Sequence, residues 1–115
     1  MYLQVRTENG IGIIATEDYI NTEGGEKILE ECKKLIEEGT SRIVVNLEKS
    51  NLINSTGIMC LLEASDAAKD AGGGICFCCA TPTMEKTFGI MGVTAVAKVV
   101  ASEDEAKEFH SPIGS

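Results

Sequence analysis

The 115-residue sequence is poor in residues that several functions require. It has one histidine, two prolines, no tryptophan, and ten basic residues against eighteen acidic ones, which gives a formal net charge of −8. Lys and Arg form no run, so we expect no nucleic-acid partner, because an acidic surface repels phosphates. No apolar stretch approaches the roughly 18 residues that cross a membrane, so we expect no membrane association.

The start of the chain and its cysteines predict a cytoplasmic protein. Met1 opens a mixed polar stretch instead of a secretory signal. The cysteines are odd in number, which favours reduced thiols over a disulfide framework. Four of the five stand among apolar residues, and their expected role is that of small buried side chains. The five are Cys32, Cys60, Cys76, Cys78 and Cys79.

Two motifs suggest a bound cofactor or metal, and their surroundings argue against both. "GIGIIA" (10–15) has the spacing of a dinucleotide-binding turn, but it leads into a strand and not into a helix. In "CFCC", strand alternation predicts Cys76 and Cys78 on one face and Phe77 and Cys79 on the other. Two thiols on one face do not make a four-ligand metal site. The sequence therefore predicts no cofactor and no metal.

The single histidine limits acid–base catalysis. A Ser-His-Asp arrangement would have to recruit His110 from the last helical turn. Ile53 also stands where a nucleophile elbow around Ser55 requires a small residue. We expect His110 to be solvated and to interact favourably with the helix dipole. The sequence therefore predicts no catalytic residue and no enzymatic activity.

Periodicity predicts one α/β domain over residues 1–110, with a disordered tail over 111–115. Two β-type runs flank Asn9-Gly10, a strong hairpin signal. Strands and helices then alternate, which predicts a mixed sheet with parallel later strands and with helices packed on it. The apolar strand 41–47 is expected to be central. Further strands are expected at 75–80 and 97–101, and helices at 23–39, from Thr56 to the glycines at 72–74, from Pro82, and after Ser102.

Helical spacing predicts which side chains face the core. Thr81 followed by Pro82 predicts the start of the third helix, and "SEDE" (102–105) is a capping box that opens the last one. The inward side chains predicted for the four helices are Ile28, Cys32, Leu35 and Ile36; Ile58, Leu61, Leu62 and Ser65; Met84, Phe88 and Met91; and Ala106 and Phe109.

The quartet "NSTG" at 54–57 places two adjacent hydroxyls between a strand and a helix. Ser55 is expected to be the N-cap of a helix that begins at Thr56. Its hydroxyl would then lie near the positive end of the helix dipole, where a phosphate is tolerated without unfolding the domain. The local sequence alone favours an ordinary N-cap, but such a cap leaves one hydroxyl and the glycine unexplained.

The pattern of the whole chain resembles the STAS domain, the fold of bacterial anti-sigma-factor antagonists. The resemblance rests on the hairpin and on "DYINTEGGEKI", "RIVVNLEKSNLINSTGIMCLLEA", "GGGICFCCATPTMEKTFGIMGV" and "VVASEDEAKEF". In that family a strand leads into Asp-Ser-[Ser/Thr/Ala]-Gly-[Leu/Ile], and the serine is phosphorylated by a kinase that is itself the anti-sigma factor. By position, Ser55 is the phosphorylated serine, and Asn54 and Asn21 stand where the family has acidic residues.

This resemblance implies a non-enzymatic, monomeric regulator that binds a kinase-type anti-sigma factor. The partner-binding residues that it implies are Asn21, Asn54, Ser55, Thr56, Gly57 and Ile58. Phosphorylation of Ser55, or less readily of Thr56, would end the complex. A small residue at Gly57 would keep the junction accessible to the partner.

Two other functions stay open at this point. In one, the domain is a constitutive docking subunit of a signalling complex without phosphorylation, which the amides at positions 21 and 54 favour, because they remove negative charge next to a kinase's magnesium. In the other, the chain is a small anion- or nucleotide-binding protein that uses the helix N-terminus as a phosphate cradle.

Overall fold

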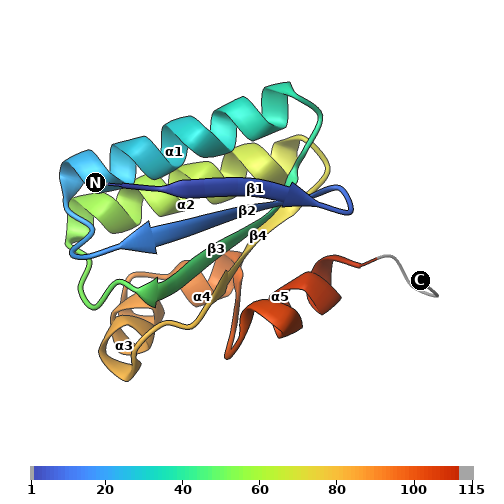
Figure 1. Cartoon of the computed structure of the whole chain (residues 1–115). Helices are drawn as coiled ribbons and strands as arrows, with labels where there is room; N and C mark the ends of the chain where they lie inside the picture. Colours follow the sequence, from blue (N-terminus) through green and yellow to red (C-terminus); the bar gives the residue numbers. More distant parts are fainter. Residues whose placement is uncertain (1, 112–115) are drawn as a thin grey trace.

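A five-stranded mixed sheet forms the middle of the molecule (Figure 1). A computed structural model describes residues 2–111 of the chain. β1 pairs antiparallel with β2, and the remaining neighbours are parallel. The predicted mixed sheet with a central third strand is confirmed. In spatial order, which is also chain order, the strands are β1 (Gln4–Glu8), β2 (Ile11–Glu17), β3 (Arg42–Lys49), β4 (Gly74–Cys78) and β5 (Lys98–Val100).

The opening hairpin turns at Asn9 and Gly10, as predicted. Both residues have positive φ, 51° and 81°, which gives the backbone twist that two-residue hairpins favour. Gly12 lies inside β2, so "GIGIIA" is a turn followed by a strand and not a phosphate-binding loop.

The helices cover the two faces of the sheet unequally (Figure 1). Parallel strands in chain order, joined by crossovers of one hand, place their connecting helices on the same face. That face carries α1 (Thr22–Glu37), α2 (Ser55–Asp70) and α3 (Pro82–Ile90), together with the four-residue α4 (Val93–Val96), which the sequence analysis did not predict. Only α5 (Glu103–His110) packs on the opposite face, against β3 and β4.

Side-chain alternation on the central strands supplies two hydrophobic cores. Ile43 and Val45 face the larger core under α1 and α2, whereas Val44 between them faces the smaller core under α5. All three side chains are fully buried. The predicted inward apolar residues of α1, α2 and α3 pack in or against the larger core, with Leu62, Ile36 and Met91 only partly buried. Ser65 is buried as predicted.

The cysteines are free, as predicted, and three of them are buried. Burial raises the pKa of Cys32 to about 12 and that of Cys76 to about 11, so these thiols are protonated and unreactive at neutral pH. Strand alternation predicts Cys79 on the same face as Phe77, and this prediction is wrong. Its φ of +63° ends the strand geometry, and it packs against the same cluster as Cys76 and Cys78.

The last helix differs from its prediction at its C-terminal end. Ala106 is buried as expected, but Phe109 is 53% exposed, and His110 is buried in its place. His110 Nε2 lies 2.8 Å from the Ile43 carbonyl oxygen. The Ser111 N–H donates to the Glu108 carbonyl oxygen at 3.1 Å. Residues 112–115 of the predicted tail lie outside the described residues.

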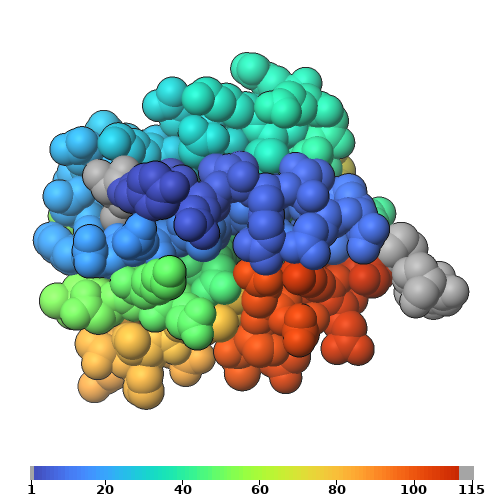
Figure 2. All heavy atoms as spheres, in the orientation of Figure 1, coloured from blue at the N-terminus to red at the C-terminus, as the bar shows by residue number. Residues whose placement is uncertain are grey.

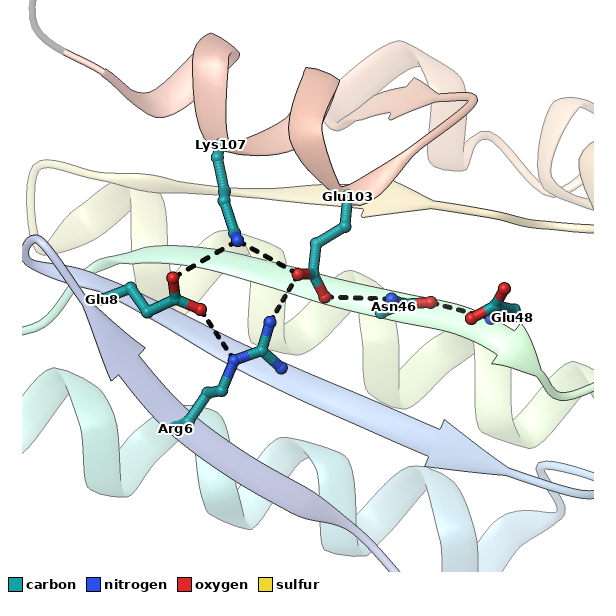
Figure 3. A network of polar contacts seen from close by, with 6 residues as sticks. All are labelled: Arg6, Glu8, Asn46, Glu48, Glu103 and Lys107. Carbon is teal, nitrogen blue, oxygen red and sulfur yellow. Dashed lines mark hydrogen bonds and ion pairs between the residues drawn. The ribbon is translucent and has the colours of Figure 1, made fainter.

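A network of charged side chains attaches α5 to the hairpin (Figure 3). Glu103 of α5 accepts hydrogen bonds from Arg6 of β1 and, at 3.0 Å, from Asn46 of β3. Lys107 lies 3.2 Å from Glu103 and 3.4 Å from Glu8. Figure 2 shows the consequence at the surface, where blue hairpin atoms lie directly against the red atoms of α5.

The carboxylates of this network remain ionised at neutral pH. Hydrogen bonds from Arg6 and Lys107 hold the pKa of Glu8 below its usual range. Burial alone would raise the pKa of Glu103, but hydrogen bonds from Asn46 and Lys107 and the charge of Arg6 outweigh it and lower the pKa.

None of the helices built from residues 2–111 is long and apolar enough to span a bilayer.

The burial of His110 predicts a pH-dependent stability. Burial lowers its pKa below 6.5, against the raising effect of the Ile43 carbonyl. Below pH 6.5 the unfolded chain binds a proton that the folded chain does not, so the free energy of unfolding falls as the pH falls. The slope reaches at most about 1.4 kcal/mol per pH unit. Urea unfolding between pH 6.5 and about 5 measures it, in a window above most carboxyl titration.

His110→Gln is expected to lose this slope, because an amide keeps a donor for the Ile43 carbonyl without titrating. Glu108→Gln, at an exposed position of the same helix, is expected to keep it. Equal slopes in the wild type and His110→Gln would contradict this account of His110.

Candidate functional site

Two strand-to-helix junctions lie side by side at the carboxyl ends of β2 and β3. Ile20 and Ile53 form an isolated parallel bridge beyond the strands. The Ile20 N–H donates to the Leu52 carbonyl oxygen at 2.9 Å, and the Asn54 N–H donates to the Ile20 carbonyl oxygen at 3.0 Å. Because these bonds align the two chain segments, α1 and α2 begin next to each other (Figure 1).

The two helices begin with the same cap. Asn21 Oδ1 accepts from the Gly24 N–H at 2.8 Å, and Asn54 Oδ1 accepts from the Gly57 N–H at 2.7 Å. Each asparagine thereby satisfies one N–H that the helix itself leaves unpaired. The amides at the positions where the family has acidic residues therefore have a structural role that a carboxylate would fill equally well.

The predicted capping role of Ser55 is wrong. The N-cap is Asn54, and Ser55 is the first residue of α2. The side chain of Asn54 reaches the N–H three residues on, so Ser55 is left with nothing to cap. Its hydroxyl makes no hydrogen bond with any residue between 2 and 111. Ser55 and Thr56 are both exposed, which leaves both hydroxyls accessible from solvent.

Gly25 and Gly57 lie where α1 and α2 approach each other, and the access that Gly57 gives to a partner stays a prediction. A Cβ on Gly25 of α1 would lie 2.8 Å from Gly57 Cα, and a Cβ on Gly57 would lie 3.0 Å from the Ile20 carbonyl oxygen. Both contacts are with backbone, which cannot move aside as a flexible side chain would. Gly25 therefore allows the first turns of α1 and α2 to touch, and Gly57 allows the start of α2 to lie against the segment that precedes α1.

The six predicted partner-binding residues divide into two groups. Asn21, Ser55 and Thr56 are exposed, and Asn54 is half-buried. Gly57 and Ile58 are buried, and Ile58 is fully inaccessible within the larger core. The structure thus corrects the inclusion of Ile58 among contact residues, because its side chain anchors α2 from below.

Three exposed apolar side chains beside these polar groups were missed by the sequence analysis. Tyr19, Leu52 and Met59 are 47%, 51% and 63% exposed. The Ile20–Ile53 bridge brings Tyr19 level with Leu52, and Met59 lies one helical turn after Ser55. The sequence signal for Met59 was an apolar residue outside the predicted core stripe of its helix. We define the junction surface as Asn21, Asn54, Ser55, Thr56, Tyr19, Leu52 and Met59.

The junction surface and His110 lie at opposite ends of the sheet. His110 lies near the amino ends of the parallel strands, whereas Ser55 follows the carboxyl end of β3. Within residues 2–111, no three His, Cys, Asp or Glu side chains are grouped as metal ligands. The first turn of α2 has no acidic residue, so an added phosphate would meet the positive end of the dipole.

These features agree with the family that the chain matches. Residues 2–106 match the STAS domain, and the chain belongs to the STAS domain family. A relative from Bordetella bronchiseptica, named "Putative anti-sigma factor antagonist BtrV", is 23% identical over 106 residues, which cover 92% of this chain and 91% of the relative.

Solved structures confirm the fold. The anti-sigma factor antagonist SpoIIAA of Bacillus superposes in its unphosphorylated and phosphorylated forms with TM-scores of 0.74 and 0.73, at 20% and 21% identity. The superpositions cover 94% of this chain and 96% and 98% of SpoIIAA. A sulfate transporter family protein from Wolinella succinogenes superposes with a TM-score of 0.79 at 16% identity, over 91% of this chain and 88% of that one.

The helix crossing gives a direct test of how the junction surface is built. Gly25→Ala is expected to lower the free energy of unfolding by about 1–3 kcal/mol, because the added methyl group forces the two helices apart. Gly89→Ala in α3 is the matched control, since a Cβ there meets nothing within 4 Å. It is expected to be neutral or to stabilise by up to about 1 kcal/mol. Chemical denaturation of both variants measures the difference, and equal stabilities would contradict the crossing.

Proposed function

We propose that the protein is an anti-sigma-factor antagonist whose junction surface binds a kinase-type anti-sigma factor and is switched by phosphorylation of Ser55. The observation that carries this proposal is the position of Ser55. Its hydroxyl is exposed, uncapped and without a hydrogen-bond partner among residues 2–111, at the start of a helix whose cap is supplied by Asn54. Modifying it therefore breaks no interaction that holds the fold.

The junction surface has the composition of a contact surface for another protein. Tyr19, Leu52 and Met59 supply apolar area, and the asparagine and hydroxyl groups supply hydrogen bonds without net charge. A phosphate on Ser55 adds a charge of about −1.5 to −2 in the middle of this surface. Burying such a charge against a partner is unfavourable unless the partner offers cations, so phosphorylation would release it.

The amides at positions 21 and 54 affect the kinase step more than the binding step. An aspartate at position 54 would cap α2 as well as asparagine does, so the fold does not select between them. A carboxylate there would lie close to the magnesium and nucleotide of an approaching kinase, and the amide removes that charge. It also removes repulsion toward the phosphate once it is attached.

Phosphorylation is tested by mass spectrometry of the intact protein. The purified chain is incubated with ATP, Mg²⁺ and each kinase-type anti-sigma factor of the source organism, together with a known substrate of that kinase as a positive control. The wild type and Thr56→Ala are expected to gain about 80 Da, one phosphoryl group, and Ser55→Ala is not. No gain with any kinase that modifies its own control substrate would overturn the switch.

Docking is tested separately from phosphorylation. Leu52→Ala/Met59→Ala is expected to weaken partner binding by about tenfold or more, since exposed apolar anchors carry much of the energy of an interface. Ile90→Ala is the matched control, because Ile90 is an apolar residue of α3 that is 75% exposed and lies outside the junction surface. Calorimetry with the unphosphorylated protein measures both. An equal loss in both variants would locate the contact elsewhere.

A second function is favoured by the two uncharged caps. The domain would then be a constitutive docking subunit of a signalling assembly. STAS domains also occur in other kinds of protein, such as the Wolinella transporter homologue. Ser55→Ala and Ser55→Asp separate the two functions. A switch predicts that Ser55→Asp weakens partner binding while Ser55→Ala does not, and a constitutive subunit predicts that both bind as the wild type does.

A further inference from the structure

A pocket of about 400 Å³ lies at the end of the sheet opposite the junction surface. Its walls come from the amino ends of β3, β4 and β5 and from the residues at which α2 and α5 end. In Figure 1 this is the side on which α2 and α5 both finish. The function proposed above makes no use of this pocket, and a cavity of this volume is large enough for a small organic molecule.

The charge of the pocket is opposite to that of the chain. Arg42, Lys69 and Lys98 line it, and none of its lining residues is acidic, in a chain with eighteen acidic residues and ten basic ones. Lys69 and Lys98 are exposed and form no ion pair with any residue between 2 and 111. Arg42 is held at the wall of the pocket by a hydrogen bond that its Nη1 donates to the His110 carbonyl oxygen at 3.2 Å.

The helix dipoles do not cancel this concentration of positive charge. The C-terminal ends of α2 and α5 each contribute about half a negative charge, which sums to about one against three full positive charges. The α2 end is also closed by its own backbone, since the Gly73 N–H donates to the Ala68 carbonyl oxygen at 2.9 Å. Among the groups that line the pocket, positive charge therefore exceeds negative charge.

An apolar wall stands beside the cations. Phe109 is 53% exposed and lines the pocket together with Ile75, Val96 and Ala97. An aromatic ring left in solvent at the rim of a basic pocket provides a surface for a planar or aliphatic group, and the cations provide one for an anionic head. The two features lie on the same cavity and describe two ends of one ligand.

We propose that this basic pocket binds a small organic anion, with its carboxylate or phosphate held by Arg42, Lys69 and Lys98 and its apolar body against Phe109. The site is separate from the helix N-termini and from Ser55, because it is built from the opposite ends of the strands and helices.

The proposal is tested by titrating the ¹⁵N-labelled protein with phenyl phosphate and, in separate arms, with benzoate, phenol and inorganic phosphate. Phenyl phosphate is expected to bind with a Kd of about 1 mM or below and to shift the amide signals of Gly72, Gly74 and His110 but not that of Ser55. Benzoate binding as tightly would assign the head group as a carboxylate. Phenol is expected not to bind, and inorganic phosphate is expected to bind more weakly for lack of an apolar body.

Two kinds of variant separate the pocket from non-specific attraction. Lys69→Gln/Lys98→Gln is expected to weaken phenyl phosphate binding about tenfold, whereas Lys33→Gln/Lys86→Gln removes the same charge elsewhere and is expected to change it little. Gly74→Met narrows the pocket without changing its charge, since a Cβ there meets nothing within 4 Å, and is expected to weaken binding too. Thermal unfolding checks that each variant is folded. No binding of either aromatic anion, or an equal effect of both lysine pairs, would overturn the proposal.

Discussion

The contact between the first turns of α1 and α2 is the constraint on which the rest of the site depends. Two glycines, Gly25 and Gly57, allow backbone to meet backbone, and the Ile20–Ile53 bridge holds the two preceding segments in line. Without this approach a gap between the two helices would separate the asparagine caps. With this contact the two caps flank one surface, on which Ser55 is the first residue of α2 and does not cap the helix.

This arrangement separates what holds the fold from what is offered to a partner. Asn54 carries the capping bond, Ile58 carries the core packing, and Ser55 between them carries neither. A charge added to Ser55 therefore changes the surface while the helix start stays intact. A similar separation holds at α5. The Glu103 network attaches α5 to the hairpin, and the strand ends beyond this network line the basic pocket.

Much of the architecture was readable from local patterns. The hairpin at Asn9-Gly10, the central strand and the order of helices and strands were all predicted, because each depends on a turn signal or on a period within a dozen residues. The errors also have local causes. Cys79 leaves strand geometry through a positive φ, which alternation does not anticipate, and the four-residue α4 is too short to show a period. In α5, helical spacing predicted that Phe109 is buried, but packing against the sheet buries His110 instead.

The sequence by itself determined the order of the elements, the position of the "NSTG" quartet at a strand-to-helix junction, and the resemblance of the chain to STAS domains. These follow from residues close together in the chain. Only the structure decided that Asn54 and not Ser55 is the cap, that Gly25 lies against Gly57 where the two helices begin, and that three basic residues share one pocket. The cap is a local contact, but asparagine and serine are both good capping residues, so the sequence alone did not choose between them. The glycine contact and the shared pocket depend on residues that are far apart in the sequence, such as Gly25 and Gly57 or Arg42 and Lys98, and such pairs meet only once the strands have set their register.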